Sequence, residues 1–234
     1  MNSDLLGSLA AGFVEHANGT ISLEAVQDQL RLKLHRLRVN DFRYGQFTSL
    51  TAILHELLTT QNQMIVTEYT CPQNHTTDER LNIGNFNCLL SAGNNLNNHA
   101  TISEWIINIQ EQSCQQCMVC GQQLMMLSKF NSIPELLAID FAGKHPQIDP
   151  CIYLYKDGTP YKFMLKGVMY YGSGHFTSRI ARSDNHTWYH DGVNTGVNTE
   201  YEGVLASLGD LMNCQGKLAT VVLYVQEQVH GFRS

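Results

Sequence analysis

Apolar residues recur at intervals of three and four along two early segments of the chain. Ser22 can cap the first segment, residues 22–38, whose apolar positions are Leu23, Val26, Leu30, Leu34 and Leu37. The second segment, residues 47–59, has the same spacing at Phe47, Leu50, Ile53, Leu54, Leu57 and Leu58. Such spacing predicts two amphipathic helices whose apolar residues pack into a core. The first ~60 residues are therefore expected to form a small helical layer.

From residue 64 onward, short runs rich in β-branched and aromatic residues replace the helical spacing. They predict strands at residues 64–70, 136–141, 152–155, 163–171, 175–182, 187–190 and 218–224. Asp157-Gly158 and Asp191-Gly192 are turn formers between strands. A polar loop is expected at residues 91–98, a short helix at 102–109 and a helix-like run at 205–212. Helices followed by antiparallel strands predict an α+β fold.

Composition narrows the classes of protein that fit. The 234 residues are 43% hydrophobic and 15% charged, which is typical of one folded domain, alone or with a subdomain. The net charge of −6 argues against nucleic acid as the main partner. No stretch approaches the ~20 apolar residues of a membrane span. Because the first residues lack a basic secretion signal, we expect an intracellular protein, cytoplasmic or nuclear.

Cysteine usage points to a metal site. Seven cysteines in a chain without a secretion signal favour reduced thiols over disulfides. Cys71 and His75 form a Cys-x-x-x-His pair, and Cys117 and Cys120 form a Cys-x-x-Cys pair. Three thiolates and one imidazole suit a tetrahedral, structural Zn²⁺ ion. Two alternatives stay open: Cys114 with Cys117 is also a Cys-x-x-Cys pair, and all these residues could be ordinary thiols and a loop histidine.

A histidine and an acid near the C-terminus have the pattern of a hydrolase base and its orienting partner. His175 follows Gly172-Ser-Gly, and Asp191 ends the run that begins at Trp188. A cysteine or serine hydrolase uses such a histidine as general base and such an acid to orient it. The glycines would let a peptide backbone approach closely. Alternatively, His175 is an ordinary residue at a strand edge and Asp191-Gly192 a hairpin turn.

The order of these motifs resembles the catalytic domain of ubiquitin-specific proteases. Residues 44–58 are similar to that family's glutamine-rich box, and the two Cys/His pairs to its zinc knuckles, with His75 in place of a cysteine. Residues 132–139 are similar to its Pro-x-x-Leu strand, Gly174-His175-Phe176 to its histidine box, and residues 220–224 to its closing strand. The resemblance covers about residues 25–225.

This resemblance implies a papain-like cysteine protease fold with a thumb, zinc-finger-like fingers and an antiparallel β palm. Residues 1–63 would be a helical partial thumb, residues 64–131 the fingers, residues 132–228 the palm with the histidine box, and residues 229–234 a tail. Ubiquitin or a ubiquitin-like protein would be the partner. His175 would be the base and Asp191 its orienter, and Cys71, His75, Cys117 and Cys120 would bind structural zinc.

The sequence departs from the family pattern at the nucleophile. Residues 1–70 contain no cysteine and so no Asn-x-x-x-Cys box. Cys88, Cys151 and Cys214 lie among apolar neighbours, as small buried residues do. Phe176 replaces the family's tyrosine, and Asp140-Phe141 replaces Arg-Phe.

Three functions are compatible with this pattern. The chain could be part of a deubiquitinase, hydrolysing ubiquitin C-terminal (iso)peptide bonds, whose cysteine box lies upstream. It could be an inactive pseudoprotease that binds ubiquitin or a ubiquitin-like modifier. It could also be a zinc-stabilised papain-like protein that acts on a different ubiquitin-like modifier.

Overall fold

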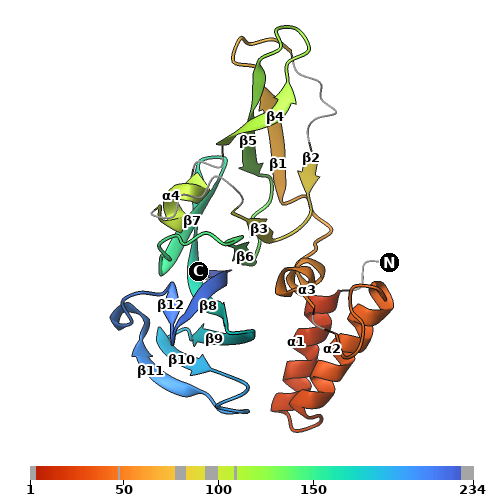
Figure 1. Ribbon diagram of the computed structural model, residues 1–234, viewed down its shortest axis with the longest axis vertical. Coiled ribbons are helices and arrows are strands. Elements are labelled where there is room, and N and C mark those ends of the chain that lie inside the picture. The colour runs from red at the N-terminus through yellow and green to blue at the C-terminus, as the bar shows by residue number, and fades with distance from the viewer. Residues whose placement is uncertain (1–3, 47, 77–82, 93–99, 108–109, 228–234) are drawn as a thin grey trace, which may run out of the picture. The chain divides into compact units, whose positions relative to one another are not determined.

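The computed structural model describes residues 4–46, 48–76, 83–92, 100–107 and 110–227 (Figure 1). The chain divides into two compact units. The first comprises Met1–Gln61 with Asn87–Leu89, and the second comprises Asn62–Phe86 with Leu90–Ser234. Within the described ranges, no helix has both the length and the apolar character needed to span a membrane.

The first unit is built on helices α1 (Leu5–Ala17), α2 (Leu23–Leu37) and α3 (Leu50–Leu57). The side chain of Asp4 caps α1 by accepting from the Gly7 amide at 2.7 Å, and that of Ser22 caps α2 by accepting from the Ala25 amide at 3.2 Å. Helices α2 and α3 confirm the two predicted helical segments, whereas α1 was not predicted. The predicted position Phe47 lies outside the described residues.

The core of the first unit gathers Leu5, Leu34 and Phe42. Helices α1 and α2 approach closely at Gly12, where a Cβ atom would lie 2.9 Å from Cγ1 of Val26. The prediction that every apolar residue of α2 packs into a core is wrong for its two terminal residues. Leu23 is 40% exposed and Leu37 is 43% exposed, because they lie beyond the packed central turns of the helix.

The second unit contains a four-stranded antiparallel sheet in the order β2-β1-β5-β4. Its strands are β1 (Ile65–Thr70), β2 (Ile83–Asn85), β4 (Gln110–Gln116) and β5 (Gln123–Phe130). Strand β1 confirms the strand predicted at residues 64–70. Strands β4 and β5 were not predicted, because they contain no β-branched residue.

The second unit also contains most of a larger sheet of nine strands, of which Leu89 in β3 is assigned to the first unit. The order is β11-β10-β9-β8-β13-β6-β3, with β12 paired to β13 and β7 to β8. The six strands predicted beyond residue 131 are all present. The strands are β3 (Leu89–Ser91), β6 (Leu136–Asp140), β7 (Cys151–Lys156), β8 (Thr159–Gly172), β9 (His175–Ala181), β10 (His186–His190), β11 (Glu200–Val204), β12 (Asn213–Cys214) and β13 (Lys217–Gln226).

Two shorter predictions had different outcomes. The expected short helix is α4 (Ile102–Ile107), which begins where Thr101 and Glu104 exchange capping hydrogen bonds. The prediction of a helix-like run at residues 205–212 is wrong, because this segment forms only a 3-10 turn, at Leu205–Ser207. Gly209 at φ +67° interrupts it, and the Asp210 side chain then accepts from the Met212 amide. Most of the predicted loop at 91–98, and residues 108–109, lie outside the described residues.

Three two-residue turns set the register of the larger sheet. Asp157-Gly158, Ser173-Gly174 and Gln215-Gly216 each have both residues at positive φ. This is the geometry of type I′ turns, whose twist matches that of the paired strands. Two of these turns place His175 at the start of β9 and Lys217 at the start of β13.

We expect Gly158→Ala to lower the free energy of unfolding by about 1 kcal/mol, because an alanine at φ +78° is strained. A Cβ atom there would meet no neighbour within 4 Å, so the cost is conformational. Gly158→Asn should cost less, since asparagine tolerates this conformation. Urea denaturation compares the variants, and equal losses for both would contradict the turn geometry.

Candidate active site and metal centre

His175 is held by a hairpin of the larger sheet. It is the first residue of β9 and lies opposite Gly172, the last residue of β8. A Cβ atom at Gly172 would lie 3.0 Å from Cγ of Lys217, so the glycine leaves room for that lysine. Gly174 has φ +73° and faces open space. Both glycines therefore have a use in building the hairpin itself, apart from any approach of a peptide.

Asp191 follows β10, and its side chain is fully buried at 0% exposure. Its Oδ1 atom lies 2.6 Å from Nε2 of His175 and accepts from the amides of Val193 at 3.0 Å and Asn194 at 3.2 Å. Its Oδ2 atom accepts from Nδ2 of Asn194 at 2.8 Å and from the hydroxyl of Tyr189 at 3.3 Å. Asp191 thus caps the turn after β10 and contacts His175 at the same time. A position in a turn and a contact with His175, which the sequence offered as alternatives, are therefore compatible.

These contacts determine the charge of Asp191 and the tautomer of His175. Burial alone would raise the pKa of Asp191. Hydrogen bonds from His175, from the amide and side chain of Asn194 and from the Val193 amide outweigh burial and hold this pKa well below its usual range. An ionised carboxylate only accepts hydrogen bonds, so Nε2 of His175 carries the proton and donates. Nδ1 is then the acceptor in the neutral ring, which is 28% exposed.

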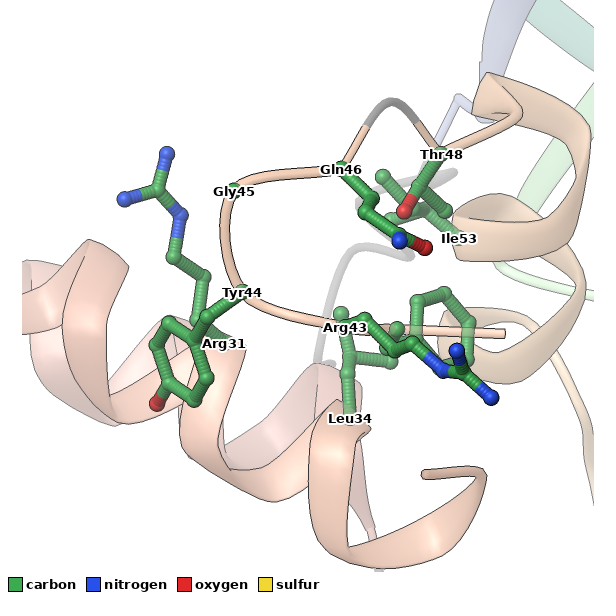
Figure 2. A pocket seen from close by; sticks show the side chains of 9 residues that line it. Arg31, Leu34, Arg43, Tyr44, Gly45, Gln46, Thr48 and Ile53 are labelled. Carbon is green, nitrogen blue, oxygen red and sulfur yellow. The ribbon is translucent and has the colours of Figure 1, made fainter. Parts of the chain in front are cut away.

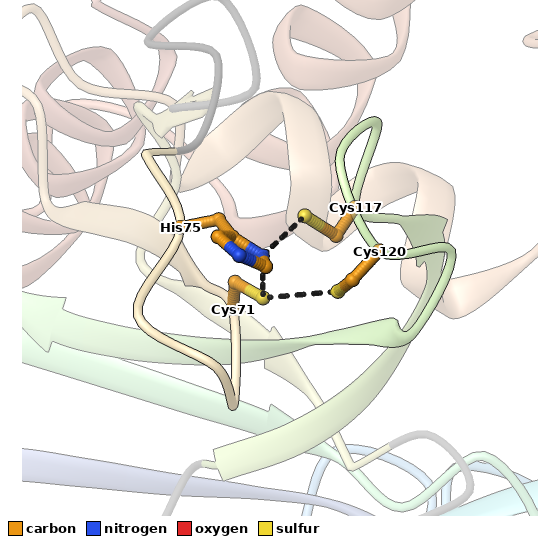
Figure 3. A group of neighbouring side chains, drawn as sticks. All are labelled: Cys71, His75, Cys117 and Cys120. Atoms are coloured by element: carbon orange, nitrogen blue, oxygen red, sulfur yellow. Dashed lines mark hydrogen bonds between the residues drawn. The ribbon is translucent and has the colours of Figure 1, made fainter.

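Cys71, His75, Cys117 and Cys120 converge in the second unit (Figure 3). Sγ of Cys71 lies 3.6 Å from Nδ1 of His75 and 3.6 Å from Sγ of Cys120. Sγ of Cys117 lies 3.7 Å from the same His75 nitrogen. All four ligand atoms lie within 4.8 Å of one another. The structure therefore brings together the four residues predicted as ligands.

The donor set fits a tetrahedral metal ion. Ligand bonds of about 2.0–2.3 Å give tetrahedral edges of roughly 3.3–3.8 Å, a range that includes the three distances above. The backbone N–H groups of Cys120 and Val119 donate to the Cys117 sulfur and lower its pKa to about 6, which favours the thiolate that a metal requires. These four residues could hold a metal ion. The side chain of Cys114 lies outside the described part of the chain.

Two of the other described cysteines, Cys88 and Cys214, do not have the properties of an activated nucleophile. Cys88 and Cys214 are buried, and Cys151 is half-buried. Burial raises the pKa of Cys88 to about 11 and also raises the pKa of Cys214. A raised pKa disfavours the thiolate, which is the reactive form.

A pocket of about 310 Å³ lies in the first unit, between α2 and the loop residues 43–46 and 48 (Figure 2). This loop includes part of the segment that resembles the glutamine-rich box. Figure 2 shows the Gln46 side chain turned toward Thr48 and Ile53. The Thr48 hydroxyl donates to the Asp41 carbonyl at 3.3 Å. None of the residues that line the pocket is a cysteine, so it contains no thiol for acyl transfer.

Sequence reasoning missed three partners of Asp191. Asn194 had a weak signal, because it follows an aspartate at a spacing common in turns. Tyr189 lies two residues before Asp191 and reaches it across the end of β10. No sequence pattern indicated that Lys217 lies near Asp191, since strand pairing brings its Nζ atom within 3.9 Å of Oδ2 of Asp191.

The fold is similar to that of solved deubiquitinase structures. The SAGA DUB module Ubp8/Sgf11/Sus1/Sgf73 bound to monoubiquitin matches with a TM-score of 0.51 and 12% identity, over 86% of this chain and 47% of that chain. The yeast SAGA DUB module with a mutant Sgf73 matches with a TM-score of 0.52 and 12% identity, over 88% and 49%. Ubp8 is a ubiquitin-specific protease, so the chain has a ubiquitin-specific-protease-like fold, as its motif order predicted.

Two further findings describe the extent of this similarity. The chain spans about half the length of the Ubp8 chains that it matches. No protein-family model and no curated protein matches the sequence.

We expect Asp191→Asn to destabilise the protein most at neutral pH. The folded pKa of Asp191 is lowered, so its stabilising contribution is fully present above the unfolded value of about 3.9 and is lost as the pH falls toward the folded value. The stability difference between wild type and variant should shrink on acidification below about pH 4. Denaturation at several pH values measures it, and a difference that grows in acid would contradict this electrostatic account.

Proposed function

We propose that the chain is a ubiquitin-specific-protease-like domain that binds ubiquitin or a ubiquitin-like protein. It carries the base and orienter for thiol-dependent hydrolysis of ubiquitin C-terminal (iso)peptide bonds. The supporting observation is the 2.6 Å contact between Nε2 of His175 and the buried carboxylate of Asp191, within a fold similar to that of Ubp8. In this proposal the first unit corresponds to a partial thumb, the four-stranded sheet to fingers and the larger sheet to a palm.

The proposed chemistry assigns the proton transfers to His175 and the positioning of its ring to Asp191. Nδ1 of His175 takes the proton of a thiol, while Asp191 holds the ring and stabilises the imidazolium. The thiolate attacks the carbonyl carbon of the ubiquitin C-terminal glycine, and His175 returns the proton to the departing amine. His175 then deprotonates water, which attacks the thioester and releases the thiol and the ubiquitin carboxylate.

A ubiquitin-binding module without hydrolysis is the second candidate function. Residues 1–70 contain no cysteine, and the first one, Cys71, lies in the Cys/His cluster. Cys88 and Cys214 are buried with raised pKa values. Hydrolysis would require an activated thiol, which neither Cys88 nor Cys214 provides, whereas binding would not.

We further propose that the ion in the Cys/His cluster is structural zinc. Three thiolates and one imidazole are a common structural zinc set, and four protein ligands leave no open coordination position. Reduced thiols are typical of intracellular compartments, so we propose a cytoplasmic or nuclear location.

We expect the recombinant chain to bind ubiquitin and to leave a fluorogenic ubiquitin C-terminal amide intact, because Cys88 and Cys214 are buried with raised pKa values and Cys71, Cys117 and Cys120 lie in the Cys/His cluster. NMR titration of ¹⁵N-labelled ubiquitin measures binding, with ubiquitin-like modifiers titrated in parallel. Shifts with a ubiquitin-like modifier alone would redirect the proposal to that modifier, and shifts with none would contradict it. Turnover that His175→Ala abolishes would show that the chain supplies its own nucleophile, contrary to the expectation.

We expect about one zinc ion per chain in the wild type and in His75→Cys, which keeps four ligands. Cys117→Ser should lose most of the zinc and lower the Tm by roughly 5 °C or more, because metal binding stabilises only the folded state. Cys88→Ser is the matched control, since this buried cysteine lies outside the cluster. Elemental analysis and thermal melts make the comparison, and a wild type without zinc after mild purification would contradict the assignment.

A further inference from the structure

Lys217 lies beside the His175–Asp191 pair and has no role in the chemistry proposed above. It is the first residue of β13, placed by the Gln215-Gly216 turn. Its Nζ atom lies 3.9 Å from Oδ2 of Asp191. Oδ1 of the same carboxylate binds His175, so Asp191 lies between two side chains that can be cationic.

The surroundings of Lys217 restrict its side chain. The side chain is only 14% exposed, which is unusual for lysine because its ammonium is strongly hydrated. Its stem lies across Gly172, where even a methyl group would come within 3.0 Å of Cγ. A lysine packed in this way keeps its charge near the Asp191 carboxylate instead of extending into water.

We propose that Lys217 is a positioning residue whose ammonium charge keeps His175 neutral, with Nδ1 free to accept a proton. This inference rests on the role proposed for His175 as a base. A positive charge beside Asp191 offsets part of the carboxylate's attraction for a proton on the ring. Without it, the carboxylate would favour the imidazolium, which cannot act as a base.

Other titratable groups also face this pair. Tyr189 reaches Oδ2 of Asp191 from β10. His190 shares the Thr195 hydroxyl with the Asp191 amide. Cys214 of β12 lies close enough to interact electrostatically with Lys217. Among these three groups none is a permanent cation, so Lys217 is the member of this set that supplies a positive charge at neutral pH.

The test separates the charge of Lys217 from its packing. Lys217→Met keeps the apolar stem over Gly172 and removes the charge, whereas Lys217→Arg keeps a charge. The pKa of His175 is measured by NMR titration of its ring resonances, assigned with His175→Gln. We expect Lys217→Met to raise this pKa by about 0.5–1 unit and Lys217→Arg to leave it near the wild-type value.

A His175 pKa that is unchanged in Lys217→Met would overturn the proposal, and so would an equal rise in Lys217→Arg. If circular dichroism shows that Lys217→Met does not fold, Lys217→Gln is held to the same criterion. The titration needs neither ubiquitin nor a thiol. Failure here is therefore distinguishable from failure of the proposed function, which would appear as absent ubiquitin binding with the His175 shift intact.

Discussion

The buried carboxylate of Asp191 is the constraint on which the end of the larger sheet depends. A buried charge is stable only where enough donors surround it. The stabilising groups come from different elements: His175 at the start of β9 and Tyr189 of β10 form hydrogen bonds with the carboxylate, and Lys217 at the start of β13 places a positive charge near it. A slip of one residue in any of these strands would turn that group to the other face of the sheet. Correct register and the ionised state of Asp191 therefore support each other.

The Cys/His cluster places a comparable constraint on the four-stranded sheet. Cys71 follows β1, while Cys117 and Cys120 lie in the connection between β4 and β5. Among the side chains that the structure describes there, the buried cluster comprises Cys71, Cys117 and Leu124, with Tyr69 packed against it. So small an apolar cluster contributes little hydrophobic stabilisation, and a bound metal would make up for it. Metal binding by the four Cys/His residues would therefore take over part of the stabilisation that apolar side chains provide in the nine-stranded sheet.

Local patterns in the sequence predict most of the architecture but not the contacts between distant residues. The leucine spacing of α2, the aromatic residues of β8 and the β-branched run of β13 identify these elements. Strands β4 and β5 are rich in glutamine and methionine, so it is pairing that makes them strands, β5 with β1 and β4 with β5. The contact between His175 and Asp191 could be predicted because the two residues belong to neighbouring predicted strands, 16 positions apart. Lys217 joins them through sheet register, which no local pattern encodes.

The central claim is that Asp191 holds the His175 ring in the tautomer whose Nδ1 atom can accept a proton. Measuring this tautomer tests the claim most directly. The tautomer can be measured by ¹⁵N NMR of the histidine rings at about pH 8, above the ordinary histidine pKa. We predict that His175 carries its proton on Nε2, and that Asp191→Asn loses this preference. A proton on Nδ1, or a wild-type ring as mixed in tautomer as a free histidine, would contradict the account.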